Sequence, residues 1–306
     1  QIPSIPQTRL ERIYRQSEKS TIVTLASQIR QGILPPDFTE KKADRSYFEI
    51  SSNQIPASIE KILDVALRSG IPARDIQVLA PMYRGAAGID TINQLMQELL
   101  NPLQKGQISF EASKFQYRSE DKVIHLVNDA EVNVFNGDLG YITDLIPAKY
   151  TESKQDEIVI DFDGNEVSYP RNEWYKIRLA YAMSIHKSQG SEFPVVFLPI
   201  TSASKRMLER NLIYTAITRA KSKLILLGEL QAFDYATKHI GTARKTYLIE
   251  RFSDLTESSE EINEPILEPT NQINPHQSYR LTEDNWTSIP VMIGISQDDL
   301  DEFFGK

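Results

Sequence analysis

Over the first 106 positions, apolar and polar residues follow the pattern of alternating helices and strands. Apolar residues recur at helical spacing in three stretches, and two short apolar runs with strand character lie between them. The expected elements are a helix at 8–31, a strand at 46–50, a helix at 57–70, a buried strand at 76–81 and a helix at 89–102. This order predicts a parallel sheet that is covered by helices.

The pattern changes at residue 107, where helical spacing disappears. Short runs with strand composition follow one another, and turn signals such as "FNGD" and "DGN" separate them. The expected strands are 107–117, 121–128, 137–146, 156–162 and 166–170. The stretch "DFDGNE" resembles a calcium loop but lacks the spaced downstream ligands, so it is interpreted as a hairpin turn. Close turns without helices predict a small β-barrel.

The first pattern returns at residue 177. The expected elements are strands at 177–184 and 194–200, a helix at 205–222, a strand at 223–229 and a mostly helical segment at 231–252. The predicted fold class is therefore α/β: one domain, residues 1–106 and 177–252, interrupted by a β insertion at 107–176. From residue 253 the chain is rich in Glu, Ser, Asn and Pro, which predicts a partly disordered acidic linker and tail at 253–306.

The net charge of −8 conceals an uneven distribution along the chain. Residues 253–306 contain 12 acidic and 2 basic side chains, whereas the remainder contains 30 acidic and 32 basic ones. A nearly neutral body neither favours nor excludes nucleic acid as a ligand, because a local basic face is what matters.

The composition narrows the chemistry further. The chain has no cysteine, which excludes disulfides and thiolate zinc sites and fits a reducing cytoplasm. Its four histidines have no ligand-like spacing, so no metal site is expected. No apolar run approaches the roughly 20 residues that a membrane-spanning helix needs, so no membrane association is expected.

The stretch "SIHKSQGSEF", residues 184–193, is a polar segment between two apolar runs. Because it follows an expected strand of a parallel sheet, we expect it at the carboxyl rim, where such sheets bind ligands. A glycine permits close backbone approach to phosphate, and an acidic side chain can accept from a ribose hydroxyl. The residues concerned are the donors His186, Lys187 and Ser188, together with Gly190 and Glu192. The alternative is a surface loop with a helix cap.

Two further clusters suggest phosphate chemistry. "LIYTAITRAK" puts Tyr214, Thr215, Thr218 and Arg219 on one helix, where the arginine can stabilise charge on a transferring phosphate. "RLERIYRQ" contains adjacent Tyr14 and Arg15, an aromatic that can stack on a base beside a cation for phosphate. The alternatives are a surface ion pair for the first cluster and solvated helix arginines for the second.

Five motifs in order carry a family resemblance: "IYRQ", "APMYRGAAGID", "VFNGDLG", "SIHKSQGSEFPVV" and "YTAITRAK". Together they resemble the carboxyl-terminal half of a RecD-type superfamily 1 DNA helicase, and in particular the stand-alone RecD-like helicases of bacteria. The resemblance covers roughly residues 1–250, and the last two motifs are the most specific.

The resemblance implies a RecA-like second motor domain with a small Src-homology-like barrel inserted in it. Helicases of this family have two such motor domains, which close on ATP and Mg²⁺ and move 5′ to 3′ along single-stranded DNA. In this chain it implies Arg219 and Arg15 as catalytic arginines, with Tyr14, Gln189, Gly190 and Glu192 at the nucleotide. It implies DNA contacts for His186, Lys187, Ser188, Arg84 and Asn136.

Part of the family pattern does not occur in these 306 residues. There is no G-x-x-x-x-G-K-S/T phosphate loop, which the family carries in its first motor domain. We therefore expect ATP and Mg²⁺ to be held mainly by that domain of the same protein, and this chain alone to be inactive. The family also suggests DNA repair or recombination.

Two questions stay open at this point. The alternative function is a non-catalytic nucleic-acid-binding module that acts as an adaptor or regulator. The terminal "QDDLDEFF" resembles a sliding-clamp-binding peptide and would give the tail a protein partner, but a helix that packs on its own body is the preferred interpretation.

Overall fold

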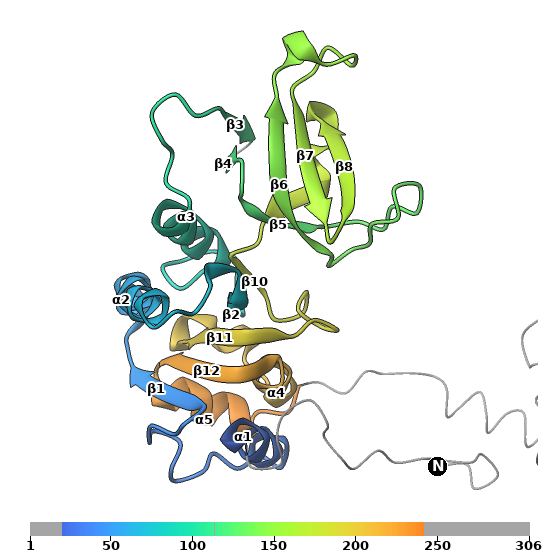
Figure 1. Ribbon diagram of the computed structural model, residues 1–306. Coiled ribbons are helices and arrows are strands. Elements are labelled where there is room, and N and C mark those ends of the chain that lie inside the picture. Colours follow the sequence, from blue (N-terminus) through green and yellow to red (C-terminus); the bar gives the residue numbers. More distant parts are fainter. Residues whose placement is uncertain (1–19, 113, 242–306) are drawn as a thin grey trace, which may run out of the picture. The chain divides into compact units, whose positions relative to one another are not determined.

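The computed structural model describes residues 20–112 and 114–241, which form two sheets, a β-hairpin and five α-helices (Figure 1). The helices are α1 (Thr21–Arg30), α2 (Ile55–Arg68), α3 (Ile89–Leu100), α4 (Arg210–Ile217) and α5 (Leu230–Lys238). None of the described helices is long and apolar enough to cross a membrane.

The larger sheet is parallel throughout, as the sequence predicts. Its order is β1–β12–β11–β2–β10, with non-sequential neighbours as in a sheet with crossover connections (Figure 1). The strands are β1 (Arg45–Glu49), β2 (Ile76–Ala80), β10 (Ala182–Ser184), β11 (Phe193–Ile200) and β12 (Ala220–Gly228).

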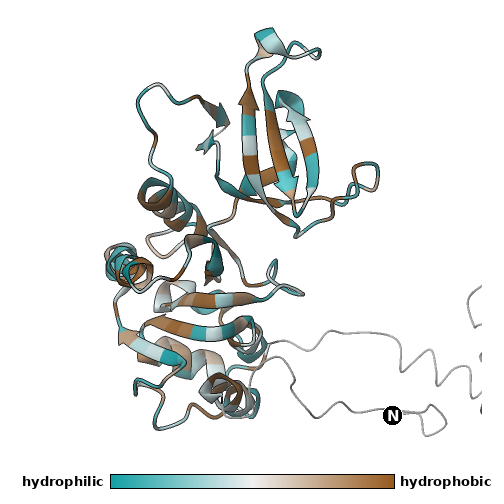
Figure 2. Cartoon of the chain, viewed as in Figure 1, coloured by the Kyte–Doolittle hydropathy of each residue, from teal (hydrophilic) through white to brown (hydrophobic). Residues whose placement is uncertain are grey.

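Helices cover both faces of this sheet, which explains the apolar run of its central strand β11 (Figure 2). In β2, Val78 and Ala80 belong to the hydrophobic cluster of α2 and α3, whereas Leu79 belongs to that of α1, α4 and α5. The side chains of β11 alternate between the same two clusters. The core of this domain therefore consists of two apolar layers, one on each side of the sheet.

The smaller sheet is antiparallel, in the order β8–β7–β6–β5–β9. Its strands are β5 (Lys122–His125), β6 (Leu139–Ile146), β7 (Glu157–Phe162), β8 (Asn165–Pro170) and β9 (Ile177–Leu179), and a 3₁₀ segment, η4 (Arg171–Lys176), precedes β9. A hairpin of β3 (Ser109–Ala112) and β4 (Phe115–Arg118) adjoins it in the sequence. We refer to β3–β9 as the inserted β domain.

The structure corrects three expected elements. The strand expected at 107–117 is the β3–β4 hairpin, and the strand expected at 177–184 is divided between two sheets, β9 in one and β10 in the other. In place of the helix expected at 205–222 the structure has the eight-residue helix α4, and the residues from Ala220 onward belong to β12. The expected helix at 8–31 is described only from α1 onward, and residues 242–306, with the tail, lie outside the described residues.

Buried polar side chains hold the crossing between the two sheets at residues 180–182. The amide of Gln77 donates to the carbonyls of Ala180 and Tyr181 at 3.0 and 3.1 Å. Asn93 both donates to and accepts from the backbone of Ala182, at 2.9 and 2.8 Å. These bonds add to the backbone bonds that Ala180 makes with Lys122 and Tyr181 with Val78, so the crossing is well supplied with partners.

Candidate nucleotide and DNA site

A polar loop, residues 185–192, joins β10 to β11. It starts after Ser184, which pairs with Ala80 at the carboxyl ends of β10 and β2. It ends at Phe193, which pairs with Ala220 at the amino ends of β11 and β12. The prediction that the whole segment lies at the carboxyl rim is therefore wrong for its second half. Because the strands are parallel, the loop runs from the carboxyl end of β10 to the amino end of β11, and it passes β2, which lies between them.

The first half of the loop is a tight turn fixed by its own backbone. The Ser184 carbonyl accepts from the amides of Lys187 and Ser188 at 3.0 and 3.3 Å. Ser188 is buried, and its hydroxyl donates to the Ile185 carbonyl at 2.7 Å. The side chain of Ser188 thus shapes the loop in this structure, although the family resemblance implies a DNA contact for it.

Lys187 links the polar loop to the inserted β domain. Its ammonium donates to Asn136 Oδ1 at 2.8 Å, and the backbone N–H of Asn136 donates to Asn128 Oδ1 at 3.0 Å. Burial, and then the nearby charge of Arg178, lower the pKa of the Lys187 amine below its usual value. Two of the residues predicted to bind DNA, Lys187 and Asn136, are therefore in direct contact.

Arg219 holds the second half of the loop. It follows α4 directly, and its guanidinium donates to the carbonyls of Ser191 at 2.9 Å, Thr215 at 3.2 Å and Ser188 at 3.4 Å. Its own carbonyl accepts from the Phe193 amide at 2.9 Å. The side chain is half-buried at the amino end of β12, outside the apolar core. The structure thus joins the "YTAITRAK" and "SIHKSQGSEF" segments at one place.

The other predicted residues of the loop are largely accessible. Gly190 has a φ of +89° with open space where a side chain would start, so backbone conformation alone favours glycine there. Glu192 forms an ion pair with Lys221 at 3.0 Å. His186 and Gln189 are exposed and help to line a pocket of about 200 Å³, together with Ile185, Arg206, Met207, Glu209, Asn211, Leu212 and Thr215.

Arg84 lies on the exposed loop after β2, at the same carboxyl edge as the start of the polar loop. Tyr14 and Arg15 lie outside the described residues. Sequence reasoning missed Arg178, whose guanidinium pairs with Asp90 at 3.1 Å and lies 5.0 Å from the ring centre of Tyr83. A single basic residue in the apolar run "IRLAYAM" gave no signal for this position.

Two family models match the chain. The UvrD-like helicase C-terminal domain matches residues 179–227, which include the polar loop and Arg219. The SH3 domain of ATP-dependent RecD-like DNA helicases matches residues 92–162, which include most of the inserted β domain. Both parts of the chain are thus similar to domains of RecD-like superfamily 1 helicases and their relatives, as the sequence motifs predict. The fold is an α/β domain with a parallel sheet and an SH3-like insertion.

Relatives agree with this family. The ATP-dependent RecD2 DNA helicase of Deinococcus radiodurans is 31% identical over 246 residues, 80% of this chain and 32% of the relative. The RecBCD enzyme subunit RecD of Mycolicibacterium smegmatis is 28% identical over 152 residues, 50% of this chain and 25% of the relative. The RecD-like chain thus spans about a third or less of the curated relatives it matches.

Solved structures of Pif1 helicases are more distantly similar. The Bacteroides Pif1 helicase in complex with ADP-AlF3 and ssDNA is 18% identical, with a TM-score of 0.46, over 81% of the RecD-like chain and 56% of the Pif1 chain.

Proposed function

We propose that this chain supplies the second motor domain of an ATP-dependent DNA helicase that moves 5′ to 3′ along single-stranded DNA. In this proposal residues 1–106 and 177–252 are the motor domain, 107–176 the DNA-contacting barrel, and 253–306 the acidic tail. The observation that carries the proposal is the polar loop. Near one end of the loop, Lys187 donates to Asn136 of the inserted β domain, and near the other end the Ser191 carbonyl accepts from Arg219.

At the nucleotide, Arg219 is the proposed arginine finger. A guanidinium that already donates to three carbonyls is oriented, and its planar group suits the oxygens of a transferring phosphate. Gln189, Gly190 and Glu192 would lie near phosphate and ribose, and Arg15 and Tyr14 would complete this side. ATP and Mg²⁺ would be held mainly by the first motor domain of the same protein, whose phosphate loop is not among these 306 residues.

At the DNA, the proposed contacts are Lys187, His186 and Asn136, with Arg84 on the neighbouring loop and Ser188 acting by shaping the turn. These groups suit a sugar–phosphate backbone and not base edges, so binding should be strongly salt-dependent and little dependent on sequence.

The short length of the loop explains how the two ligands would be coupled. A nucleotide that repositions Arg219 must move the carbonyls of Ser188 and Ser191 to which it donates. Because Lys187 is next to Ser188 in a hydrogen-bonded turn, the DNA end of the loop would move as well. This is a direct connection between phosphate chemistry and the grip on DNA.

The test of the finger is Arg219→Ala in the intact protein, with DNA-stimulated ATP hydrolysis as the measurement. We expect turnover to fall on the order of 10³-fold while nucleotide binding changes much less, because a finger acts in the transition state. Arg68→Ala is the matched control, since Arg68 is an exposed arginine on α2 that pairs only with Asp64 among the described residues. A loss of turnover under tenfold would remove the assignment.

Polarity is tested separately with partial duplexes. The proposal expects ATP-dependent strand separation when the single-stranded overhang is 5′ and none when it is 3′. Unwinding from the 3′ overhang alone would contradict the proposed direction while leaving the assignment of Arg219 untouched.

A further inference from the structure

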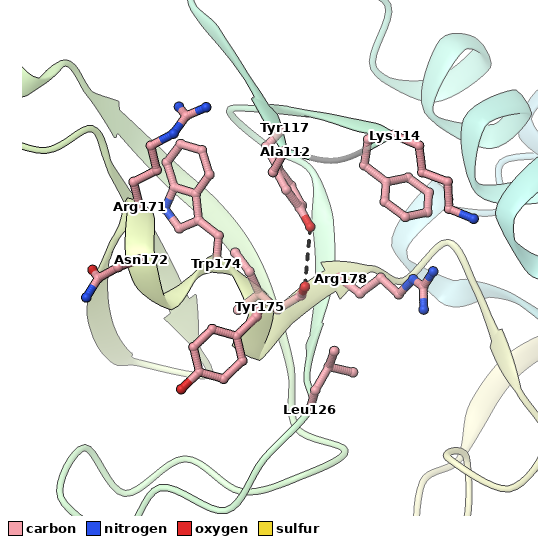
Figure 3. A pocket seen from close by; sticks show the side chains of 11 residues that line it. Ala112, Lys114, Tyr117, Leu126, Arg171, Asn172, Trp174, Tyr175 and Arg178 are labelled. Atoms are coloured by element: carbon pink, nitrogen blue, oxygen red, sulfur yellow. Dashed lines mark hydrogen bonds between the residues drawn. The ribbon is translucent and has the colours of Figure 1, made fainter.

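A pocket of about 510 Å³ opens on the inserted β domain, and no residue discussed for the nucleotide or DNA site so far, except Arg178, belongs to it (Figure 3). It lies between the β3–β4 hairpin and η4. The lining residues are Ala112, Lys114, Phe115, Tyr117, Leu126, Arg171, Asn172, Trp174, Tyr175, Ile177 and Arg178. We refer to it as the aromatic pocket.

One wall of the aromatic pocket is buried and its mouth is exposed. Trp174 is buried, stacks on Phe110 with ring centres 5.4 Å apart, and donates from Nε1 to the Tyr169 carbonyl at 2.9 Å. Tyr175, the next residue, is 69% exposed. In Figure 3 its ring stands at the edge of the pocket, with the hydroxyl pointing away from Trp174. A rigid indole beside a solvent-exposed phenol is a suitable surface on which a planar ligand can stack.

Three cations accompany the aromatic rings. Arg171 lies 4.9 Å from the ring centre of Trp174, and Arg178 and Lys114 lie 5.1 and 5.6 Å from that of Phe115. Arg178 and Lys114 share one carboxylate, that of Asp90. Arg171 pairs with the Asp156 carboxylate at 3.3 Å. Three cations beside these two carboxylates leave a net positive charge next to the aromatic faces, and proteins that bind single-stranded nucleic acid use this combination for bases and phosphates.

Arg178 connects the aromatic pocket to the proposed DNA contacts. Its guanidinium lies 5.0 Å from the ring centre of Tyr83, the residue before Arg84. A DNA strand bound by Lys187 and Arg84 would therefore meet Arg178, which lines the aromatic pocket, as its next cationic contact.

We propose that the aromatic pocket receives an unpaired base of the DNA strand, stacked on Tyr175, with Arg171 and Arg178 facing the flanking phosphates. This inference rests on the proposed DNA-binding function and adds a base-stacking site on the inserted β domain. Aromatic grooves of small barrels also accept proline-rich peptides, but such peptides offer no phosphate to the cationic rim, so the strand is the better match.

The test measures binding of a fluorescent oligothymidylate of about 15 residues to the 306-residue chain at low ionic strength. Tyr175→Ala should weaken binding about 5- to 150-fold, the range that alanine substitution of a stacking aromatic gives. Because Tyr175 is exposed, its removal leaves the core intact. The control is Tyr150→Ala, since Tyr150 is 72% exposed elsewhere on the same domain and should leave affinity unchanged.

An abasic strand of equal length separates stacking from charge. Wild-type protein should bind it more weakly than oligothymidylate, and Tyr175→Ala should bind the two strands alike. Equal binding of oligothymidylate by wild type and Tyr175→Ala would overturn the stacking site, and so would an effect confined to a proline-rich peptide. Failure of the proposed function has a different signature, namely no binding of either strand by the wild-type chain and no response to Lys187→Ala.

Discussion

A buried lysine in the inserted β domain makes a measurable prediction about stability and pH. Lys122 in β5 is only 4% exposed. Its ammonium donates to the Arg74 carbonyl at 3.3 Å and lies 5.7 Å from the ring centre of Phe193. No carboxylate bonds to it within residues 20–112 and 114–241, and burial lowers its pKa from 10.5 to about 8. Folding therefore disfavours the charged form of Lys122.

The size of the effect follows from the pKa difference. A drop from 10.5 to about 8 corresponds to about 3 kcal/mol between protonation states, at about 1.4 kcal/mol per pH unit. Because the pKa in the folded state is the lower one, the unfolded chain binds more protons between these values. The contribution of Lys122 to stability is thus fully present above pH 10.5 and is lost as pH falls through about 8.

Lys122→Met replaces the ammonium with an uncharged side chain of similar length. We compare the free energy of unfolding of the variant with that of wild type. The difference should favour the variant more at pH 7 than at pH 10.5, by up to about 3 kcal/mol. The measurement is urea unfolding of both proteins across this range. Since every other lysine and tyrosine titrates in both proteins, the difference between them isolates Lys122. A stability difference that does not change with pH would refute the reasoning.

Two further substitutions test the junction and the polar loop. Tyr181→Phe removes the 3.0 Å hydrogen bond from the Tyr181 hydroxyl to the buried Asp121 carboxylate. It should lower the free energy of unfolding by about 1.5–3 kcal/mol, and a loss under about 0.5 kcal/mol would contradict the role of this bond. Gly190 and Gly106 have φ of +89° and +87° and lie in open space, so Gly190→Ala and its control Gly106→Ala should each lower the free energy of unfolding by about 1–2 kcal/mol in thermal unfolding. Only Gly190→Ala should reduce ATP turnover of the intact protein.

The parts of the fold that could be predicted are those whose signal is local. The unbroken apolar run of β11 predicts a strand covered on both faces. The β7–β8 hairpin is predicted because its two loop residues, Asp163 and Gly164, both need positive φ, at 55° and 92°. In each case a few neighbouring residues are enough to determine the local structure.

The parts that could not be predicted depend on distant partners. The turn signal between Ala112 and Phe115 is weak, since the two intervening residues are Ser and Lys and include no Gly, Pro, Asn or Asp. The break between β9 and β10 falls at Ala180 and Tyr181, in an apolar run without Gly or Pro. It is made by buried amides from elsewhere in the chain, such as Gln77, 103 residues before Ala180.

The same distinction applies to the candidate site. The motifs indicated two separate polar segments, and the structure brings Arg219 of one onto the backbone of the other, the polar loop. That the loop runs from the carboxyl end of one strand to the amino end of the next follows from their parallel direction. The motifs could not predict that β2 lies between these two strands, because strand order is a property of the whole sheet. The aromatic pocket was missed for a related reason, since its walls come from the β3–β4 hairpin and from η4.

The path of the polar loop explains why so polar a segment separates two buried strands. A short connection across a parallel sheet leaves many backbone groups outside both ladders, and these need partners. Ser188 and Arg219 satisfy several of them, which makes the loop a rigid piece instead of a free hinge. Rigidity is what a coupling element requires, because a ligand at one end can act at the other only if the segment between them does not absorb the displacement. The hydrogen bonds that stabilise the crossing are therefore the same ones that would transmit a change at Arg219 to Lys187.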